Sequence, residues 1–369
     1  MYLENAWYVA AWVEDIGRKL TERKICGQPL VMYRKENGDP VVLSNLCPHR
    51  FAPLSSGRIK GDAVQCGYHG MTFGETGKCV HNPHHGGHIP SAMEVRRYPA
   101  VDRHNLVWVW LGNPEVADAS LIPDFSCLAD PNFSTQRGTF HMDANYVLIT
   151  DNLLDLSHAE LVHEGILSSP GLLASKLESF QAGDTIWANR WIPDSEAPPA
   201  WGHVYSMCQG GAPNQDVDHW AYMRWDAPAH LLLDVRVTSV GGARSEGVWV
   251  YGTDIITPID ETHSMYFWGI SRNHDIDDRN IDSLWEKAIE AAFGGQDKPM
   301  IESQQRMLGN RSLEEMNPVL IPADQAATRA RRHLEALIKS GATPKPGAEA
   351  LNALLKEGGK SRAPVERMV

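Results

Sequence analysis

The sequence predicts an α+β protein with two domains: a small all-β domain, then a larger domain that combines an antiparallel sheet with helices. Three observations support this. Short apolar runs separated by turn residues occupy positions 29 to 111, as in small all-β domains. Longer apolar and aromatic runs between positions 185 and 270 are typical of one antiparallel sheet. Helix-forming segments follow at 281–293, 300–308 and 323–338.

Within the first domain, the segment 37–39 (Asn-Gly-Asp) separates β-type runs at 29–33 and 40–43 and predicts a hairpin. Further short strands are expected at 63–65, 71–73 and 106–111. The second domain is expected to open with a strand at 140–146. With 369 residues, the chain is long enough for two domains. We expect residues 1–137 to form the first domain with its linker, 138–340 the second domain, and 341–369 a loosely packed C-terminal extension.

Composition narrows the possible functions. The formal net charge of −12 provides no basic surface for a nucleic-acid backbone. No apolar run reaches the roughly 18 residues expected of a membrane span. The opening residues lack the charged segment and apolar core of a signal peptide. We therefore expect a cytoplasmic protein that binds neither nucleic acid nor membrane, and whose cysteines are thiols or metal ligands rather than disulfides.

The most informative motif lies at positions 47 to 69. It reads Cys47-Pro48-His49, a spacer of 16 residues, and Cys66-Gly67-Tyr68-His69. Zinc Cys2His2 fingers usually carry both cysteines before both histidines. A Rieske-type [2Fe–2S] cluster instead needs two Cys on one iron and two His on the other. Because each short segment here provides one of each, Cys47, His49, Cys66 and His69 are predicted cluster ligands, with structural zinc as the alternative.

A histidine-rich segment follows at positions 81 to 88, His-Asn-Pro-His-His-Gly-Gly-His. Its four histidines could bind a metal. The Gly and Pro residues among them predict a loop. We interpret the segment as an exposed loop beside the cluster domain.

A second group of candidate ligands lies at positions 148 to 163. Apolar residues at 149, 153, 156 and 161 predict an amphipathic helix. Asp155 and His158 are three residues apart and share a face. His158 and His163 are five apart, about 140° on an ideal α-helix. They converge on one ion only if the helix ends between them or contains a π-type turn.

The upstream cluster favours a metal at this second group, because a one-electron centre needs an acceptor. The usual acceptor is a mononuclear Fe(II) held by two His and one carboxylate. His158 and His163 would supply the imidazoles, and a carboxylate would come from elsewhere in the chain. Asp155 is better placed to hydrogen-bond His158.

Together the two motifs resemble those of the Rieske non-heme iron aromatic-ring oxygenases. The cluster pattern is joined by Asp151-Asn152-Leu153-Leu154-Asp155-Leu156-Ser157-His158 and by His163. The opening Asn5-Ala6-Trp7-Tyr8-Val9-Ala10 and the length are most similar to the branch of vanillate O-demethylase and dicamba monooxygenase. The resemblance implies a second domain of the helix-grip, START-like kind.

The resemblance also implies roles for particular residues. Asp297 stands in the position of the third iron ligand, with Glu302 as the alternative. Asn152 is expected close to the iron without binding it. The family assembles as a head-to-tail homotrimer, in which Asp155 would connect His158 of its own chain to cluster ligand His69 of the partner subunit.

The reaction that the resemblance implies is O-demethylation of a methoxylated, vanillate-like aromatic acid with O2, releasing formaldehyde. NADH would reduce a separate flavin and Fe–S reductase, since this chain shows no Gly-rich dinucleotide motif. Ring or methyl hydroxylation, or N-demethylation, on the same machinery is the enzymatic alternative. A Rieske electron carrier is the non-enzymatic one. Residues 164–180 and 195–218 are expected to cover the substrate pocket.

Overall fold

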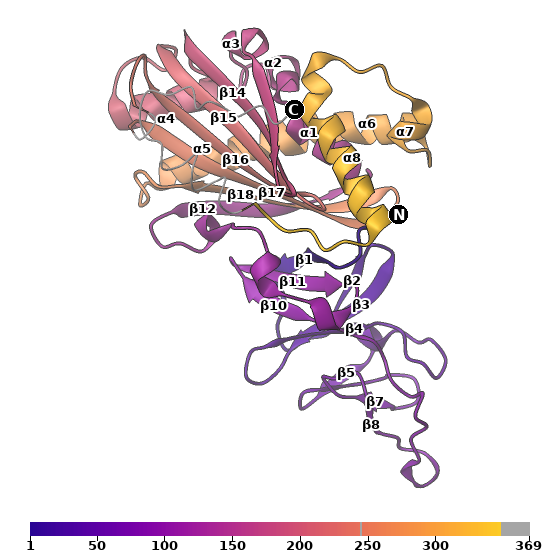
Figure 1. The fold of residues 1–369 in the computed structure, drawn as a ribbon. Helices are drawn as coiled ribbons and strands as arrows, with labels where there is room; N and C mark the ends of the chain where they lie inside the picture. The colour runs from indigo at the N-terminus through magenta and orange to yellow at the C-terminus, as the bar shows by residue number, and fades with distance from the viewer. Residues whose placement is uncertain (244–245, 348–369) are drawn as a thin grey trace. The chain divides into compact units, whose positions relative to one another are not determined.

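The structure is a computed structural model that describes residues 1–243 and 246–347 (Figure 1). The chain forms two compact units. Within the described residues, the first comprises Met1–Ile122, Thr257–Glu261 and Gly341–Thr343, and the second comprises Pro123–Ile256, Thr262–Ser340 and 344–347. Most of the expected C-terminal extension, 348–369, lies outside the described residues. Within the described ranges, no helix is long and apolar enough to cross a membrane.

Three small sheets build the first unit. One has the order β1-β11-β10, the next β2-β3-β4-β9 and the last β5-β6-β7-β8. The predicted hairpin is confirmed, because β3 and β4 pair antiparallel on either side of the 37–39 turn. The strands are β1 Ala6–Trp12, β2 Thr21–Ile25, β3 Gln28–Arg34, β4 Pro40–Ser44, β5 Arg58–Lys60, β6 Ala63–Gln65, β7 Thr72–Phe73, β8 Cys79–His81, β9 Arg97–Tyr98, β10 Ala100–Arg103 and β11 Leu106–Leu111.

One apolar core in this unit includes both predicted cluster cysteines. Cys47 and Cys66 pack with buried residues such as Val31, Leu43 and Phe73. The β3–β4 and β6–β7 pairs contribute these side chains. The packing of this core therefore fixes the positions of the two cysteines.

A seven-stranded sheet with the order β12-β18-β17-β16-β15-β14-β13 dominates the second unit. Figure 1 shows its long strands fanned into one curved sheet. All pairs from β13 to β17, and the pair β12–β18, are antiparallel. The predicted antiparallel sheet is thus confirmed. The strands are β12 Ser134–Met142, β13 Leu177–Ala182, β14 Thr185–Glu196, β15 Asp216–Asp226, β16 His230–Ser239, β17 Val248–Asp260 and β18 His263–Arg272.

The helices of the second unit pack on this sheet and on one another. Helix α8 contacts α1, the edge strand β13 and its neighbour β14, and α6 contacts α1. The helices are α1 Tyr146–Leu154, α2 Ala159–Val162, α3 Gly171–Ala174, α4 Pro199–Gln209, α5 Arg279–Ile289, a π-helix over Glu290–Asp297, α6 Lys298–Leu308, α7 Leu313–Met316 and α8 Gln325–Ser340. The helices predicted at 281–293, 300–308 and 323–338 are therefore confirmed.

Two boundaries at the start of the second unit differ from those predicted from the sequence. The expected strand at 140–146 is instead β12, which begins at Ser134 and ends at Met142. Asn145 then caps α1, its side chain accepting a hydrogen bond from the amide of Val147 at 2.9 Å. The segment expected as a linker also belongs to this unit from Pro123 on, because β12 pairs with β18.

A buried ion pair ties α5 to the sheet. Arg272 at the end of β18 is 1% exposed and donates to Asp282 of α5 at 2.7 Å, and Ser134 Oγ of β12 donates to the same carboxylate at 2.7 Å. Asp282→Ala leaves the Arg272 guanidinium buried with less countercharge. We expect it to lower the free energy of unfolding by about 3 to 5 kcal/mol.

Urea denaturation followed by tryptophan fluorescence measures this change. Asp277→Ala, which removes an exposed acid from the same turn region, is the matched control and should unfold like the parent chain. Equal midpoints for the two variants would contradict the assignment of Asp282 as the buried counterion.

Candidate metal centres and the adjoining pocket

Two loops of the same backbone design present the 47–69 motif. The amide of Phe51 donates to the carbonyl of Cys47 at 2.7 Å, and the amide of Gly70 donates to that of Cys66 at 3.1 Å. Both residues, four positions after the cysteine, have positive φ values of 57° and 77°. This left-handed turn is favourable for Gly70 and strained for Phe51. The two loops thus present their ligands in equivalent ways.

The cysteine side chains of these loops are buried, and the histidine side chains are more exposed. Cys47 and Cys66 are 2% and 3% exposed, whereas His49 is exposed and His69 half-buried. The two imidazole rings lie 4.5 Å apart, centroid to centroid. Burial raises the pKa of the Cys47 thiol to about 11. A bound cation would lower the pKa of this thiol. Two cysteines inside and two histidines outside fit a cluster that has one thiolate-bound and one imidazole-bound iron.

These four donors do not meet at one point. Among the described residues, the groups of at least three potential ligand atoms that lie within 4.8 Å of one another include none of them. A zinc ion needs all four ligands at bonding distance of one centre. The separation therefore favours the binuclear cluster over structural zinc.

The histidine-rich loop at 81–88 touches this site. The ring Nε2 of His84 lies 2.8 Å from the backbone carbonyl of His69, and the two rings are 6.3 Å apart. Asn82 Nδ2 donates to the carbonyl of His88 at 2.6 Å and closes the loop on itself. The exposed loop expected from the sequence therefore also supports the backbone of one predicted cluster ligand.

The second group of candidate ligands, His158, His163 and Asp297, lies at or next to interruptions of regular α-helix. The helix expected over 148–163 is interrupted, because α1 ends at Leu154 and a 3-10 turn over Leu156–His158 precedes α2. His163 follows α2 directly. Asp297 ends the π-helix, whose i→i+5 bond runs from the Lys298 amide to the Phe293 carbonyl. The π-turn considered for the histidine pair thus occurs at the carboxylate instead.

Three side chains meet at this point. His158 Nε2 is 3.5 Å from Asp297 Oδ1, and His163 Nε2 is 3.1 Å from Asp297 Oδ2. The two imidazole rings are 5.2 Å apart. Asp297 and His163 are each 2% exposed. A buried carboxylate with two imidazoles on one side matches the two-His, one-carboxylate set of non-heme Fe(II) sites.

The other ring nitrogen of each histidine is held in place. Nδ1 of His158 lies 2.5 Å from the backbone carbonyl of Asp155, and Nδ1 of His163 lies 2.9 Å from the side-chain oxygen of Gln296. Both acceptors require Nδ1–H, which leaves the Nε2 lone pairs directed at Asp297. The residues therefore fit a cation between the three side chains. Gln296 was missed by sequence reasoning, although it directly precedes Asp297.

Asn152 and Asp155 lie beside this group. Asn152 Nδ2 donates to Asp297 Oδ1 at 3.2 Å, so it touches a predicted ligand. The contact of Asp155 with His158 runs through the backbone carbonyl rather than the carboxylate. The carboxylate instead accepts from the amide and hydroxyl of Ser157 at 3.0 and 2.6 Å, and Arg190 lies 3.8 Å away.

A pocket adjoins the two imidazoles. The inner face of the sheet forms its floor, with Ala221 and Met223 of β15 and Leu233 and Val235 of β16. His158 and His163 also line it. Its cavity volume is about 80 Å³. Leu167, Leu172 and Trp201 also line it, so both segments expected to cover the pocket contribute walls.

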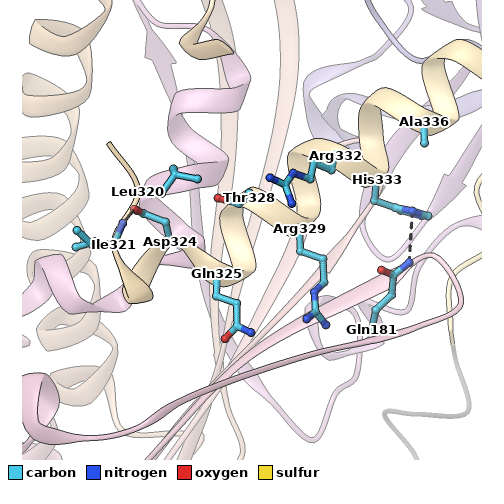
Figure 2. Close-up of a pocket in the computed structure, with 10 residues that line it drawn as sticks. All are labelled: Gln181, Leu320, Ile321, Asp324, Gln325, Thr328, Arg329, Arg332, His333 and Ala336. Atoms are coloured by element: carbon cyan, nitrogen blue, oxygen red, sulfur yellow. Dashed lines mark hydrogen bonds between the residues drawn. The ribbon is translucent and has the colours of Figure 1, made fainter. Parts of the chain in front are cut away.

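The second unit also contains another hollow and another group of potential metal ligands, but neither combines a pocket with a metal-ligand set. A shallow hollow between α8, β13 and residues 320–325 is lined by charged side chains such as Arg329, Arg332 and Asp324 (Figure 2). It shares no lining residue with the pocket at His158 and His163. Cys208, His274 and Asp275 form a second group of close donor atoms. The neighbouring Arg272 guanidinium bonds the carbonyls of His274 and Asp275 and disfavours a cation there.

Comparison with known proteins agrees with the geometry of both centres. Residues 6–99 match the family model of the Rieske [2Fe-2S] domain, and residues 142–340 match that of the vanillate O-demethylase oxygenase C-terminal domain. The chain belongs to the Rieske non-heme iron oxygenases of the vanillate O-demethylase branch. It is a Rieske-type monooxygenase, which excludes the reading as an electron carrier alone.

Several relatives cover nearly the whole of this oxygenase. The oxygenase component of chloroacetanilide N-alkylformylase from Rhizorhabdus wittichii is 37% identical over 347 residues, 94% of this chain and 98% of its own. The oxygenase component of dicamba O-demethylase from Stenotrophomonas maltophilia is 37% identical over 91% of this chain and 98% of its own. A crystal structure of dicamba monooxygenase bound to 3,6-dichlorosalicylic acid superposes with a TM-score of 0.85 at 36% identity, covering 92% and 98% of the two chains.

Proposed function

We propose that this oxygenase removes a methyl or other small alkyl group from the oxygen or nitrogen of an aromatic substrate by hydroxylating the carbon beside that heteroatom. One observation carries the proposal. His158 and His163 line an apolar pocket, and together with Asp297 they form a group of three potential metal ligands. The named activities of the dicamba and chloroacetanilide relatives are also dealkylations. O-demethylation of a methoxylated arene, vanillate-like in the sequence prediction, is the reaction that we place first.

The residues present would hold two metal groups. Cys47, His49, Cys66 and His69 would bind the cluster, and His158, His163 and Asp297 the mononuclear Fe(II). When bound, the cluster supplies electrons singly and the iron activates dioxygen towards a C–H bond. Gln296 and the Asp155 carbonyl hold the two imidazoles in their metal-binding tautomer. The apolar walls exclude water from the reacting carbon.

The overall reaction balances with one O2, two electrons and two protons. One oxygen atom enters a methyl C–H bond and the other leaves as water. The resulting hemiacetal breaks its C–O bond, giving the phenol and formaldehyde. A substrate with N–CH3 in place of O–CH3 would follow the same course to an amine and formaldehyde.

We infer two protein partners. The relatives are named as oxygenase components, and a separate NADH-oxidising flavin and Fe–S reductase would supply the electrons. The second partner is a further copy of this chain in a head-to-tail homotrimer. In that assembly Asp155 would connect the two centres, with its backbone carbonyl on His158 and its carboxylate on His69 of the partner subunit.

The test uses the holoenzyme with a reductase, NADH, O2 and a methoxylated arene, and scores formaldehyde against NADH consumed. We expect formaldehyde and the phenol in equal amounts. A hydroxylated product that retains its methoxy group would instead establish ring hydroxylation. NADH oxidation without any oxygenated product across the substrate series would refute the proposal.

A further inference from the structure

The pocket beside His158 and His163 is almost entirely apolar. Leucine, valine, alanine, methionine and aromatic side chains make up most of its lining. Apart from the two predicted metal ligands, the polar residues that line it are His219 and Asp254. Neither Lys nor Arg occurs among the described residues that line the pocket. Any substrate is therefore held by few polar side chains and by no cationic side chain among the described residues of the lining.

The strand register places the two polar residues at opposite ends of the pocket floor. His219 of β15 pairs with Val237 of β16, whereas Asp254 of β17 pairs with Leu231 of β16. These two levels are six positions apart along β16. Ala221, Met223, Leu233 and Val235 lie between them.

Asp254 lies at the end near the candidate iron ligands. Tyr266 donates to its carboxylate at 2.7 Å, and the Tyr266 ring is 6.0 Å from that of Phe293, which is 6.2 Å from the ring of His163. This acid already has a hydrogen-bond donor. It supplies no positive charge in either protonation state.

His219 lies at the other end and has no such partner. It is 6% exposed, and neither ring nitrogen forms a hydrogen bond with any described residue. Its ring lies 6.4 Å from that of Trp201, another residue of the pocket lining. A buried imidazole without a partner is costly, so a ligand that bonds it relieves that cost. Burial also lowers the pKa of His219 to about 4, which keeps the ring uncharged near neutral pH.

The apolar lining and the uncharged imidazole of His219 favour an uncharged substrate. A carboxylate bound at the His219 end, away from the proposed iron, would lose its hydration and find no cationic side chain to replace it. A neutral imidazole offers one N–H donor and one acceptor nitrogen, which suits a carbonyl, amide or hydroxyl. We propose that the substrate is an uncharged aromatic compound whose alkyl group lies beside His158 and His163 and whose polar group hydrogen-bonds His219.

This inference rests on the proposed dealkylation and narrows its substrate class. The methoxylated arene remains as the reacting unit, but the acid group of a vanillate-like substrate is replaced by a neutral polar group. His219 then acts as a specificity residue at the end of the pocket away from the reacting carbon.

A matched pair of probes tests the charge. 4-Methoxybenzamide and 4-methoxybenzoate have nearly the same size and shape, and they differ in charge at pH 7.5. In calorimetric titrations of the anaerobic holoenzyme without reductase, we expect the amide to bind about 10-fold more tightly or better, because the acid leaves a buried charge unpaired. Equal affinities, or tighter binding of the benzoate, would overturn the inference.

Variants of His219 test the contact. His219→Leu should weaken amide binding by about 3- to 10-fold, the usual effect of losing one hydrogen bond. His219→Gln keeps a donor and an acceptor and should retain most of the affinity, which also covers the case in which the leucine variant folds poorly. His203→Leu, an exposed histidine on α4, is the control. Unchanged amide affinity in both His219 variants would overturn the contact.

The two proposals fail in different ways. If the amide binds more tightly and yields no formaldehyde with the reductase present, the proposed dealkylation is wrong while the charge selectivity stands. If formaldehyde is released from the benzoate and the amide does not bind, the dealkylation stands and the inference about charge is wrong.

Discussion

Asp297→Ala is expected to abolish product formation while the Rieske cluster remains. The carboxylate lies 3.1 to 3.5 Å from both candidate imidazole ligands, and its Oδ2 is buried without a hydrogen bond from the described residues. Only two imidazoles would then remain at the proposed site. We expect turnover to fall by more than the roughly 10- to 100-fold that loss of a supporting partner costs.

Iron and acid-labile sulfide analysis measures the change directly. The iron content should fall from about three to about two atoms per chain, with the sulfide and the cluster spectrum unchanged. Asp277→Ala provides the control for loss of an acid. Full iron content in Asp297→Ala would contradict the ligand assignment.

Glu302→Gln separates Asp297 from the alternative that the sequence left open. In the structure, Glu302 accepts a hydrogen bond from the amide of Asp143 at 3.1 Å and lies 3.3 Å from Lys298 Nζ. It is thus engaged at the start of α6 rather than in the group formed by His158 and His163. We expect Glu302→Gln to retain its iron, and iron loss in this variant alone would reverse the assignment.

The two loops that carry the candidate cluster ligands could be located from sequence because each pair of candidate ligands is local. Each Cys–His pair lies within four residues, so spacing alone limits the geometry. The hairpin at 37–39 was predictable for the same reason, since turn chemistry acts over a few residues. The second centre is different. Asp297 is far from His158 in the sequence, and only the tertiary structure brings the two side chains together. Asp297 was therefore predicted from the family resemblance and not from residue spacing.

The interrupted helix and the pocket residues escaped prediction for physical reasons. The apolar spacing at 149, 153, 156 and 161 is the same whether the helix is continuous or broken, and the break depends on the backbone of Asp155 (φ −113°, ψ 83°). His219 lies in a buried strand, where both faces carry apolar residues. Which face lines the pocket depends on sheet register and on the helices above it. Neither the sheet register nor the packing of the helices can be deduced from the sequence of β15 alone.

Asp155→Asn is expected to keep both metal centres yet lower turnover about 100-fold or more, given the size of such effects beside metal ligands. The bonds to the carboxylate from the described residues all end on Oδ1, and the side chain is 22% exposed. Asparagine retains an oxygen that accepts from Ser157, so the local fold should survive. It lacks the charge and the second acceptor oxygen that a connection to His69 of the partner subunit needs.

Rapid-mixing measurements of cluster reoxidation, with substrate and O2 present, separate this role from a structural one. The Asp155→Asn cluster should be reduced normally and then reoxidised slowly, whereas Asp143→Asn, an exposed acid near α1, should match the parent chain. Ser157→Ala removes the 2.6 Å bond to Asp155 without removing its charge and should retain most of the activity. If Ser157→Ala is as slow as Asp155→Asn, the carboxylate serves only to shape the turn before His158. Full activity in Asp155→Asn would remove the route between subunits from the proposed mechanism.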